Sequence, residues 1–168
     1  YTYDGVGNRL TKVEGGTTTT YSYDAANELT VEQAGASYTT YSYDANGNTT
    51  VENAAGSRTT YSWDIENLLT QVALPAGTNV TFTYDGERRR RTKSEAGTLT
   101  NFLRDGERVL IEADSGGTTQ ARYTLQGDGW FDPLIAMRRS GATSFYHFDG
   151  LGSADRLTSA AQAVTDSY

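Results

Sequence analysis

The sequence contains no cysteine, two prolines and one histidine among its 168 residues. Without cysteine the chain can form neither a disulfide nor a cysteine-ligated metal site. Apolar runs are short, and none approaches the ~20 residues that a membrane-spanning helix requires. The chain begins at Tyr1 without the charged and then apolar segment that is typical of a signal peptide. We therefore expect a segment of a longer protein, with any targeting signal elsewhere.

Positive charge is also scarce. The chain has 14 Lys and Arg against 21 Asp and Glu, a net charge of −7 and a pI near 4.6. An acidic chain lacks the counterion release that drives nucleic-acid binding, and anionic membrane surfaces repel it. The mean hydropathy is −0.59, but 11% of the residues are aromatic, with 12 tyrosines. Tyrosine and threonine favour pleated, half-buried strands, so the composition indicates β-structure rather than disorder.

A Tyr-x-Tyr-Asp motif recurs along the chain. From Asp4 to a weaker copy at Asp105, its aspartates are separated by 20, 20, 20, 21 and 20 residues. A fixed period of this length predicts one supersecondary unit per repeat. The residues predicted to anchor the repeats are Tyr1, Tyr3, Asp4, Tyr21, Tyr23, Asp24, Tyr41, Tyr43, Asp44, Tyr61, Trp63, Asp64, Tyr84, Asp85, Phe148 and Asp149.

Two further motifs divide each repeat. An Asn-x-Leu-Thr-like stretch follows the first four anchors, and a small-residue pair such as Gly15-Gly16 precedes the next anchor. An aspartate at a strand exit can accept bonds from backbone amides two residues on, and Gly and Asn tolerate positive φ. We therefore predict a β-hairpin with a four- or five-residue turn, followed by a glycine-rich turn. Its turn and return-strand residues are Asn8, Leu10, Asn27, Leu29, Asn48, Asn67 and Leu69.

Polarity within a repeat alternates with a period of two. Tyr21 and Tyr23 are predicted to share one face of their strand. In the return strand, Leu29 and Val31 are predicted to share a face, with Glu32 opposite. We expect the tyrosines of neighbouring repeats to stack beside a ladder of leucine and valine, while threonine, serine and glutamate face solvent.

The predicted fold is all-β, with tandem antiparallel β-hairpins forming a continuous, twisted ribbon. Eight hairpins give about 16 strands, and a spacing of ~4.8 Å gives an arc of roughly 75 Å. Closed into a circle, this arc has a diameter of roughly 24 Å, too narrow to enclose a folded domain of ~100 residues. The segment is therefore expected to be one wall of a larger shell, a roll filled by its own side chains, or a link in an end-to-end oligomer.

The order Tyr-x-Tyr-Asp-x-x-Gly-Asn-x-Leu-Thr resembles the YD repeat of the RHS (rearrangement hotspot) family, and the resemblance covers the whole chain. Residues 146–158 resemble the RHS-associated core segment, and residues 127–134 resemble the irregular unit that precedes it. We therefore divide the chain into a YD-repeat array at 1–125 and a core-type segment at 126–168 that continues the same sheet. The residues that carry the core motif are Gly150, Gly152, Ser153 and Leu157.

The resemblance implies a structural role. Members of this family use YD ribbons as hollow shells that hold a polymorphic C-terminal toxin, or as scaffolds on the cell surface. It therefore implies a bacterial protein that is secreted or surface-exposed, is not an enzyme and needs no cofactor. The expected partners are other segments of the parent chain, further copies of this chain, a toxin cargo or a surface glycan. Nucleic-acid binding and membrane insertion are not expected.

A carbohydrate-binding adhesin is the alternative. Aromatic faces suit sugars, and glucan-binding repeats of bacterial surfaces also run about 20 residues per hairpin. Those repeats depend on tryptophan, whereas this chain has only Trp63 and Trp130. A stacking ladder that forms the core of the ribbon is the favoured interpretation, because the tyrosine period is the period of the fold itself.

Four other features have structural interpretations. The stretch from Asp44 to Asn48 resembles the start of a calcium loop but lacks the glutamate at its twelfth position. His147 lacks a cysteine or a serine in a nucleophile elbow and is predicted to be a strand residue. Two of the arginines in the run 88–91 are expected to reach the aromatic face and stack there. Asp132, before a proline, is predicted to be structural.

Overall fold

The computed structural model describes residues 1–127 and 133–168. Trp130 and Asp132, which the sequence singles out, lie outside the described residues. No helix among the described residues is long and apolar enough to cross a membrane. The strands are β1 (Thr2–Tyr3), β2 (Arg9–Glu14), β3 (Thr17–Tyr23), β4 (Leu29–Ala34), β5 (Ser37–Tyr43), β6 (Thr49–Ala54), β7 (Ser57–Trp63), β8 (Leu69–Ala73), β9 (Asn79–Tyr84), β10 (Arg90–Glu95), β11 (Thr98–Asp105), β12 (Arg108–Ala113), β13 (Thr119–Leu125), β14 (Leu134–Arg139), β15 (Ala142–Phe148), β16 (Ala154–Ser159) and β17 (Val164–Ser167).

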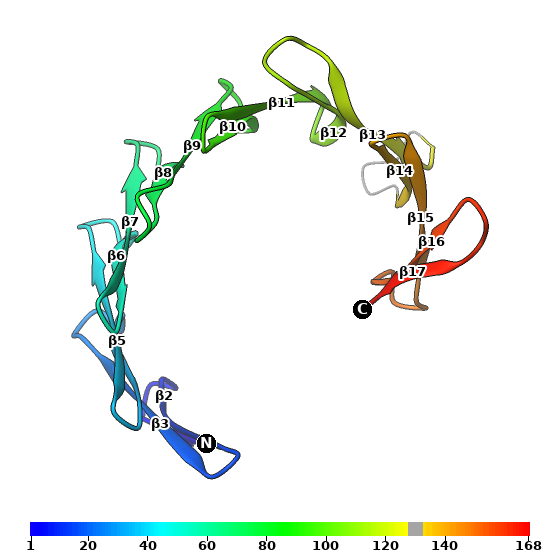
Figure 1. Cartoon of the computed structure of the whole chain (residues 1–168). Helices are drawn as coiled ribbons and strands as arrows, with labels where there is room; N and C mark the ends of the chain where they lie inside the picture. Colours follow the sequence, from blue (N-terminus) through cyan, green and yellow to red (C-terminus); the bar gives the residue numbers. More distant parts are fainter. Residues whose placement is uncertain (128–132) are drawn as a thin grey trace. The chain divides into compact units, whose positions relative to one another are not determined.

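Within each part of the chain that the structure describes, the strands form successive antiparallel hairpins, in which a strand pairs with the next one along the chain (Figure 1). The prediction of an all-β ribbon of tandem hairpins is confirmed. Residue contacts divide the chain into two compact units, Tyr1–Phe82 and Thr83–Tyr168. The division at 125/126 inferred from the motifs concerns the type of repeat and stays a prediction.

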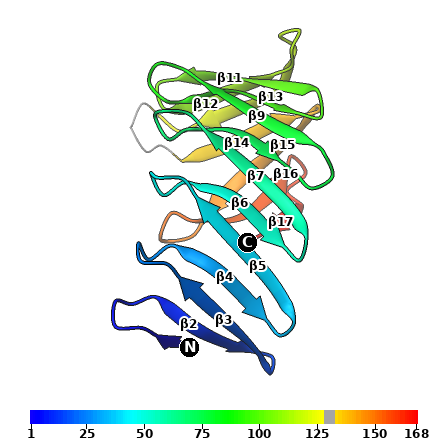
Figure 2. The ribbon, with the colours of Figure 1, turned by 90° about the vertical axis from the view of Figure 1, so that its left-hand side faces the viewer.

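Two kinds of turn alternate in the first unit, where β2 to β7 lie side by side (Figure 2). The turn that follows each anchor aspartate spans five residues, as at Asp24 to Glu28. The turns at the other end of the strands, between β2 and β3, β4 and β5, and β6 and β7, have two residues, and at Ala55-Gly56 both have positive φ, 50° and 93°. This is the backbone of a type I′ turn, whose twist matches that of the flanking strands. The turn between β8 and β9 is longer, with five residues from Leu74 to Thr78. The alternation explains the repeat length of about 20 residues.

In the first unit a β-bulge follows each aspartate turn, in the strand that leaves the turn. Ser22 pairs with Val31 but Tyr23 pairs with Leu29, so Thr30 is an extra residue in β4. The hydroxyl of Thr30 donates to the carbonyl of Ser22 at 3.1 Å. The bulge recurs at Thr50 and Thr70, whose hydroxyls donate to the carbonyls of Ser42 and Ser62. The extra residue bends the strand and increases its local twist.

The bulge overturns the predicted assignment of faces. Directly opposed residues of an antiparallel pair share a face. Glu32 opposes Tyr21, so the glutamate lies on the tyrosine side, which we call the aromatic face. Val31 opposes Ser22 and lies on the other side, which we call the threonine face. The prediction that Leu29 and Val31 share a face is therefore wrong, because strict alternation ignores the inserted residue.

The described residues of the two units enclose no core. Among the described residues, the buried apolar side chains are Tyr21, Val80, Ala113, Ala121 and Ala136, and no large side chain is fully buried. Tyr41, Tyr61 and Trp63 on the aromatic face are half-buried, while Thr20 and Ser22 are exposed. Stability must therefore come mainly from contacts between neighbouring hairpins, as in other repeat architectures.

The second unit changes the turn pattern. Asp105, predicted as a weak anchor, pairs with Arg108 across a two-residue turn. The five-residue aspartate turn lies instead between β12 and β13, where Asp114 accepts the backbone amides of Gly116 and Thr118. Successive turns of a meander lie at opposite ends of its strands, so this turn lies at the opposite end of β12 from Asp105. The sequence missed it because no tyrosine precedes Asp114.

Candidate functional site

The aspartate turns share one geometry. Oδ1 of Asp44 accepts the backbone amides of Asn46 and Asn48, both at 2.9 Å, and Oδ2 accepts the Asn48 side-chain amide at 3.0 Å. The amide of Asp44 itself donates to the carbonyl of Asn48 at 2.9 Å. Oδ1 makes the two backbone contacts, at 2.8 to 3.0 Å, in the turns at Asp4, Asp24, Asp44, Asp64, Asp85, Asp114 and Asp149. The carboxylate thus supplies an acceptor for amides that the turn leaves without a backbone partner.

The asparagines predicted as one motif occupy two different places. Asn27 and Asn67 are the fourth residues of their turns, with φ of 64° and 60°. Asn8 and Asn48 are the fifth residues, and their side chains donate to the aspartate of their own turn. Each also donates to the asparagine of the next turn, Asn8 to Asn27 at 2.9 Å and Asn48 to Asn67 at 2.8 Å. Neighbouring turns are therefore linked in pairs along this edge of the first unit.

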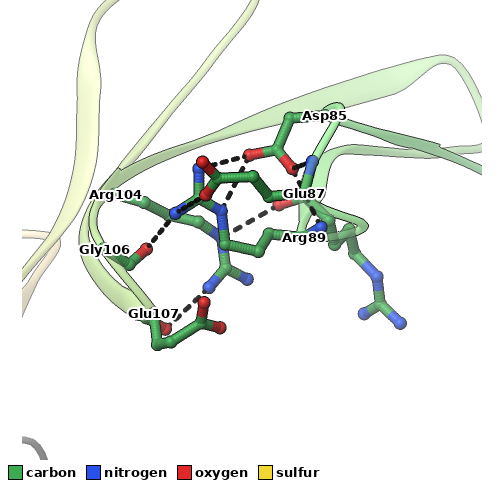
Figure 3. A network of polar contacts seen from close by, with 7 residues as sticks. Asp85, Glu87, Arg89, Arg104, Gly106 and Glu107 are labelled. Carbon is green, nitrogen blue, oxygen red and sulfur yellow. Dashed lines mark hydrogen bonds and ion pairs between the residues drawn. The ribbon is translucent and has the colours of Figure 1, made fainter.

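Arginine makes the equivalent link in the second unit (Figure 3). Nε of Arg89 donates to Asp85 at 2.9 Å, and Nη1 donates to the carbonyl of Gly106 in the next turn at 3.0 Å. Arg104 donates from Nε to the carbonyl of Arg90 in the neighbouring hairpin at 3.1 Å, and from Nη1 to the carbonyl of Glu107 in its own turn at 2.9 Å. Arg89 of the arginine run therefore links two neighbouring turns, a role that the sequence analysis did not predict.

A second series of links joins consecutive hairpins through the residue before the aspartate. The hydroxyl of Tyr23 donates to the carbonyl of Arg9 at 3.0 Å, and that of Tyr43 to Leu29 at 2.8 Å. The indole Nε1 of Trp63 donates to Thr49 at 2.8 Å. Donor and acceptor are 14 residues apart each time, and the same spacing separates Arg104 from Arg90. The residues before the anchor aspartates therefore act as hydrogen-bond donors between consecutive hairpins, and the stacking of the tyrosines stays a prediction.

Carboxylates and one guanidinium lie among the tyrosines of the first unit. The Tyr61 hydroxyl donates to Glu52 at 3.1 Å, and the guanidinium carbon of Arg9 lies 4.3 Å from the centroid of the Tyr21 ring. Burial raises the pKa of Tyr41 and Tyr61, and the Glu52 carboxylate adds to the rise at both. An arginine thus stacks on a tyrosine ring at Arg9, and the stacking expected of the run 88–91 stays a prediction.

The remaining predicted site residues have varied surroundings. Tyr1 and Tyr3, at the start of the chain, are 70% and 58% exposed. Leu29 and Leu69 oppose Tyr23 and Trp63, whereas Leu10 is the extra residue of its bulge. In the core motif, Gly150 and Gly152 lie in the turn that begins at Asp149, and Gly152 has a φ of 83°. The backbone amide of Ser153 donates to the Asp149 carboxylate. Leu157 pairs with Tyr146, and Phe148 pairs with Ala154. His147 Nε2 is 2.9 Å from the hydroxyl of Thr158.

The aspartate turns predict loss of stability in acid. The Asn48 side chain and amide hold the pKa of Asp44 below 3.8, and backbone amides do the same, as the leading cause, for Asp24, Asp85 and Asp114. At Asp4 partial burial opposes the shift, but four hydrogen bonds outweigh it and lower the pKa. A lowered folded pKa contributes stability above pH 3.8 that is lost as the pH falls through the folded value.

Glu28 acts in the opposite direction. Burial, followed by the nearby Asp24 and Asp44, raises its pKa above 4.5, so it contributes stability at low pH that is lost as the pH rises through its folded pKa. Five aspartates outnumber this one glutamate, so we expect the Tm to fall as the pH is lowered below 3.8. Thermal unfolding followed by circular dichroism measures this, and the fall should be smaller for Asp44→Asn. A Tm that stays constant below pH 3.8 would contradict the assignment.

Residues 1–91 match the family model described as Teneurin YD-shell. The chain belongs to the YD-shell family. The prediction of a YD/RHS repeat protein is confirmed, and the matched residues include the turns from Asp4 to Asp85. No curated protein sequence matches the chain.

Solved structures share the YD-shell fold. The chain is similar to TcdB2-TccC3, with a TM-score of 0.60 and 11% identity over 99% of this chain and 12% of that one. TcdB2-TccC3 without its hypervariable C-terminal region gives a TM-score of 0.57 and 12% identity over 90% of this chain and 9% of that one. The chain therefore spans about a tenth of the length of these structures, and the likeness shows the fold.

Proposed function

We propose that this chain is a stretch of wall in a YD-repeat shell that encloses or presents a C-terminal toxin or effector. The observation that carries the proposal is the pair of repeating links between hairpins. Side chains from one hairpin bond the backbone 14 residues earlier, and turn residues bond the next turn. These bonds make each hairpin depend on its neighbour, which is what a continuous wall one layer thick requires. The repeated anchor and turn residues thus make hydrogen bonds that hold neighbouring hairpins together.

The shell likeness supports an enclosing role. One matched structure is TcdB2-TccC3 without its hypervariable C-terminal region, so that protein carries a variable segment at its C-terminus. We propose the same arrangement for the parent of this chain, with other segments of the parent completing the wall. A secreted or surface-displayed bacterial protein is the proposed setting.

Cysteine labelling of the parent protein tests the enclosing role. Thr19 opposes Ala34 on the aromatic face, and the adjacent Thr20 lies on the threonine face. The aromatic face carries half-buried rings whose further burial is favourable, so we expect it to face the enclosed cargo. Thr19→Cys should lose most of its reactivity toward a maleimide when cargo is present, while Thr20→Cys keeps it. The 168-residue chain alone, in which each introduced cysteine is unique, supplies the reference rates. Equal rates with and without cargo at both positions would refute enclosure on this side.

Glycan binding by the aromatic face is the alternative function. The hydroxyls of Tyr23 and Tyr43 and the indole of Trp63 already donate to backbone carbonyls, so these donor hydrogens are not available to a sugar. Saturable change of tryptophan fluorescence on titration with glycans would favour the adhesin. End-to-end association of copies also remains a proposal, and a monodisperse monomer in size-exclusion chromatography would exclude it.

A further inference from the structure

Two arginines of the second unit lie directly opposite each other. Arg122 of β13 pairs with Arg138 of β14, on the face away from Tyr123. The equivalent cross-strand pairs in the first unit are Thr20–Gln33, Thr40–Asn53 and Thr60–Ala73. Like charges directly opposed in a sheet are destabilising. The hairpin therefore carries an unfavourable pair where other hairpins carry polar or small residues.

No carboxylate compensates this pair within residues 1–127 and 133–168. The other cross-strand neighbour of Arg122 is Ile111, and that of Arg138 is Thr143. Neither guanidinium has a hydrogen bond or an ion pair among the described residues, and both side chains are exposed. By contrast, the adjacent Arg139 bonds Glu112 at 2.8 Å on the opposite face. Arg139 thus has a structural role, whereas the donors of Arg122 and Arg138 have no partner among the described residues.

The two guanidiniums border a hollow of about 320 Å³. Its other lining residues are Thr119, Gln120, Ser140 and Gly141, so it contains side-chain donors and no acidic residue. A hollow of this size holds a carboxylate or phosphate group, and paired arginines are suited to bind one through charge-assisted bonds.

Apolar side chains flank the arginines on the same face. Along the row that contains the pair, Leu103 opposes Ile111, which opposes Arg122. In the next row, Phe145 opposes Ala136, two residues from Arg138. Leu103 and Phe145 are 49% and 38% exposed. Cationic and apolar groups are therefore available side by side on this surface.

We propose that this surface binds an extended acidic peptide segment of a partner protein, with a glutamate or aspartate side chain between Arg122 and Arg138. Residues two apart in an extended peptide point the same way, at ~6.8 Å spacing. Apolar residues two positions before and after the acidic one therefore reach Leu103 and Ile111 on one side and Phe145 on the other. Nucleic acid fits less well, because a chain of phosphates requires a longer row of cations than this pair supplies. The site does not depend on the enclosing role.

Fluorescence anisotropy with the full 168-residue chain tests the proposal. The probe is a labelled peptide with leucine, serine, glutamate, serine and leucine in succession, and the control peptide has glutamine for glutamate. Arg122→Thr and Arg138→Gln introduce the residues of the Thr20–Gln33 pair. Arg58→Thr removes an arginine of the first unit that is also exposed and serves as the matched control. We expect each site variant to weaken binding about tenfold or more, and Arg58→Thr to leave it unchanged.

Thermal unfolding separates a binding site from a structural pair. Removal of the like-charge contact should leave the Tm of Arg122→Thr unchanged or raise it by about 1–3 °C, whereas loss of a structural bond would lower it. Equal affinity for the two peptides, or unchanged binding by both site variants, would overturn the proposal. Two further results together would also overturn the proposal and indicate a free-anion site. Inorganic phosphate at millimolar concentration and constant ionic strength would displace the peptide, and replacing the two leucines of the peptide by serine would leave its affinity unchanged.

Discussion

Replacement of Asp44 by alanine is expected to lower the Tm of the chain by about 5 °C, measured by circular dichroism. The substitution removes the acceptor for the amides of Asn46 and Asn48 and for the Asn48 side chain. It also frees the Asn48 side chain, which donates to Asn67 in the next turn at 2.8 Å. One substitution thus weakens a turn and its link to the next hairpin.

Asp105→Ala is the matched control for this experiment. Asp105 occupies the same place in the sequence repeat, but it lies in a two-residue turn and its carboxylate accepts no hydrogen bond from the described residues. Its replacement should change the Tm by about 1 °C or less. Asp44→Asn, which keeps one acceptor oxygen, should fall between the two alanine variants. Equal losses for Asp44→Ala and Asp105→Ala would show that the hydrogen bonds of the turn do not matter.

Replacement of Trp63 by alanine is expected to lower the free energy of unfolding by about 2–3 kcal/mol in urea denaturation, less than for a fully buried ring because Trp63 is only half-buried. Two interactions are lost, the packing of the ring opposite Leu69 and the 2.8 Å bond from Nε1 to the carbonyl of Thr49. Trp63→Phe keeps most of the packing and should cost about 1 kcal/mol, the net contribution of the hydrogen bond.

Tyr3 provides the comparison for Trp63. It also precedes an anchor aspartate, but its side chain is 58% exposed and no earlier hairpin of this chain lies beside it. Tyr3→Ala should therefore change the free energy of unfolding by only about 0.5 kcal/mol. If Trp63→Phe is as stable as the unmodified chain, the link across 14 residues contributes no stability.

The hairpin order and the aspartate turns could be predicted because each depends on local chemistry. The spacing of Asp4, Asp24 and Asp44 sets the unit, and an aspartate followed by a Gly or Asn in the left-handed region specifies the turn. The links across 14 residues could not be predicted in this way. They depend on how far the Tyr43 ring reaches over the neighbouring strand, which the linear pattern does not encode.

The side assignment of Glu32 failed for a physical reason. Thr30 adds one residue to the return strand, and one inserted residue reverses every later side chain. A threonine six residues after an aspartate is the only sequence sign, and Leu10 occupies the equivalent position in the first repeat. The bulge becomes visible only when the partner strand fixes the register.

The equal spacing of the links has a consequence for how such a chain can change in length. Removal of residues 24–43, a stretch of 20 residues, would join Tyr23 to Asp44. The new junction would reproduce the order Tyr-Ser-Tyr-Asp, and Trp63 would still find the carbonyl of Thr49 14 residues before it. Insertion of one unit preserves the same joints. A gene for this repeat array can therefore gain or lose whole repeats by unequal recombination, and each product already contains the stabilising contacts.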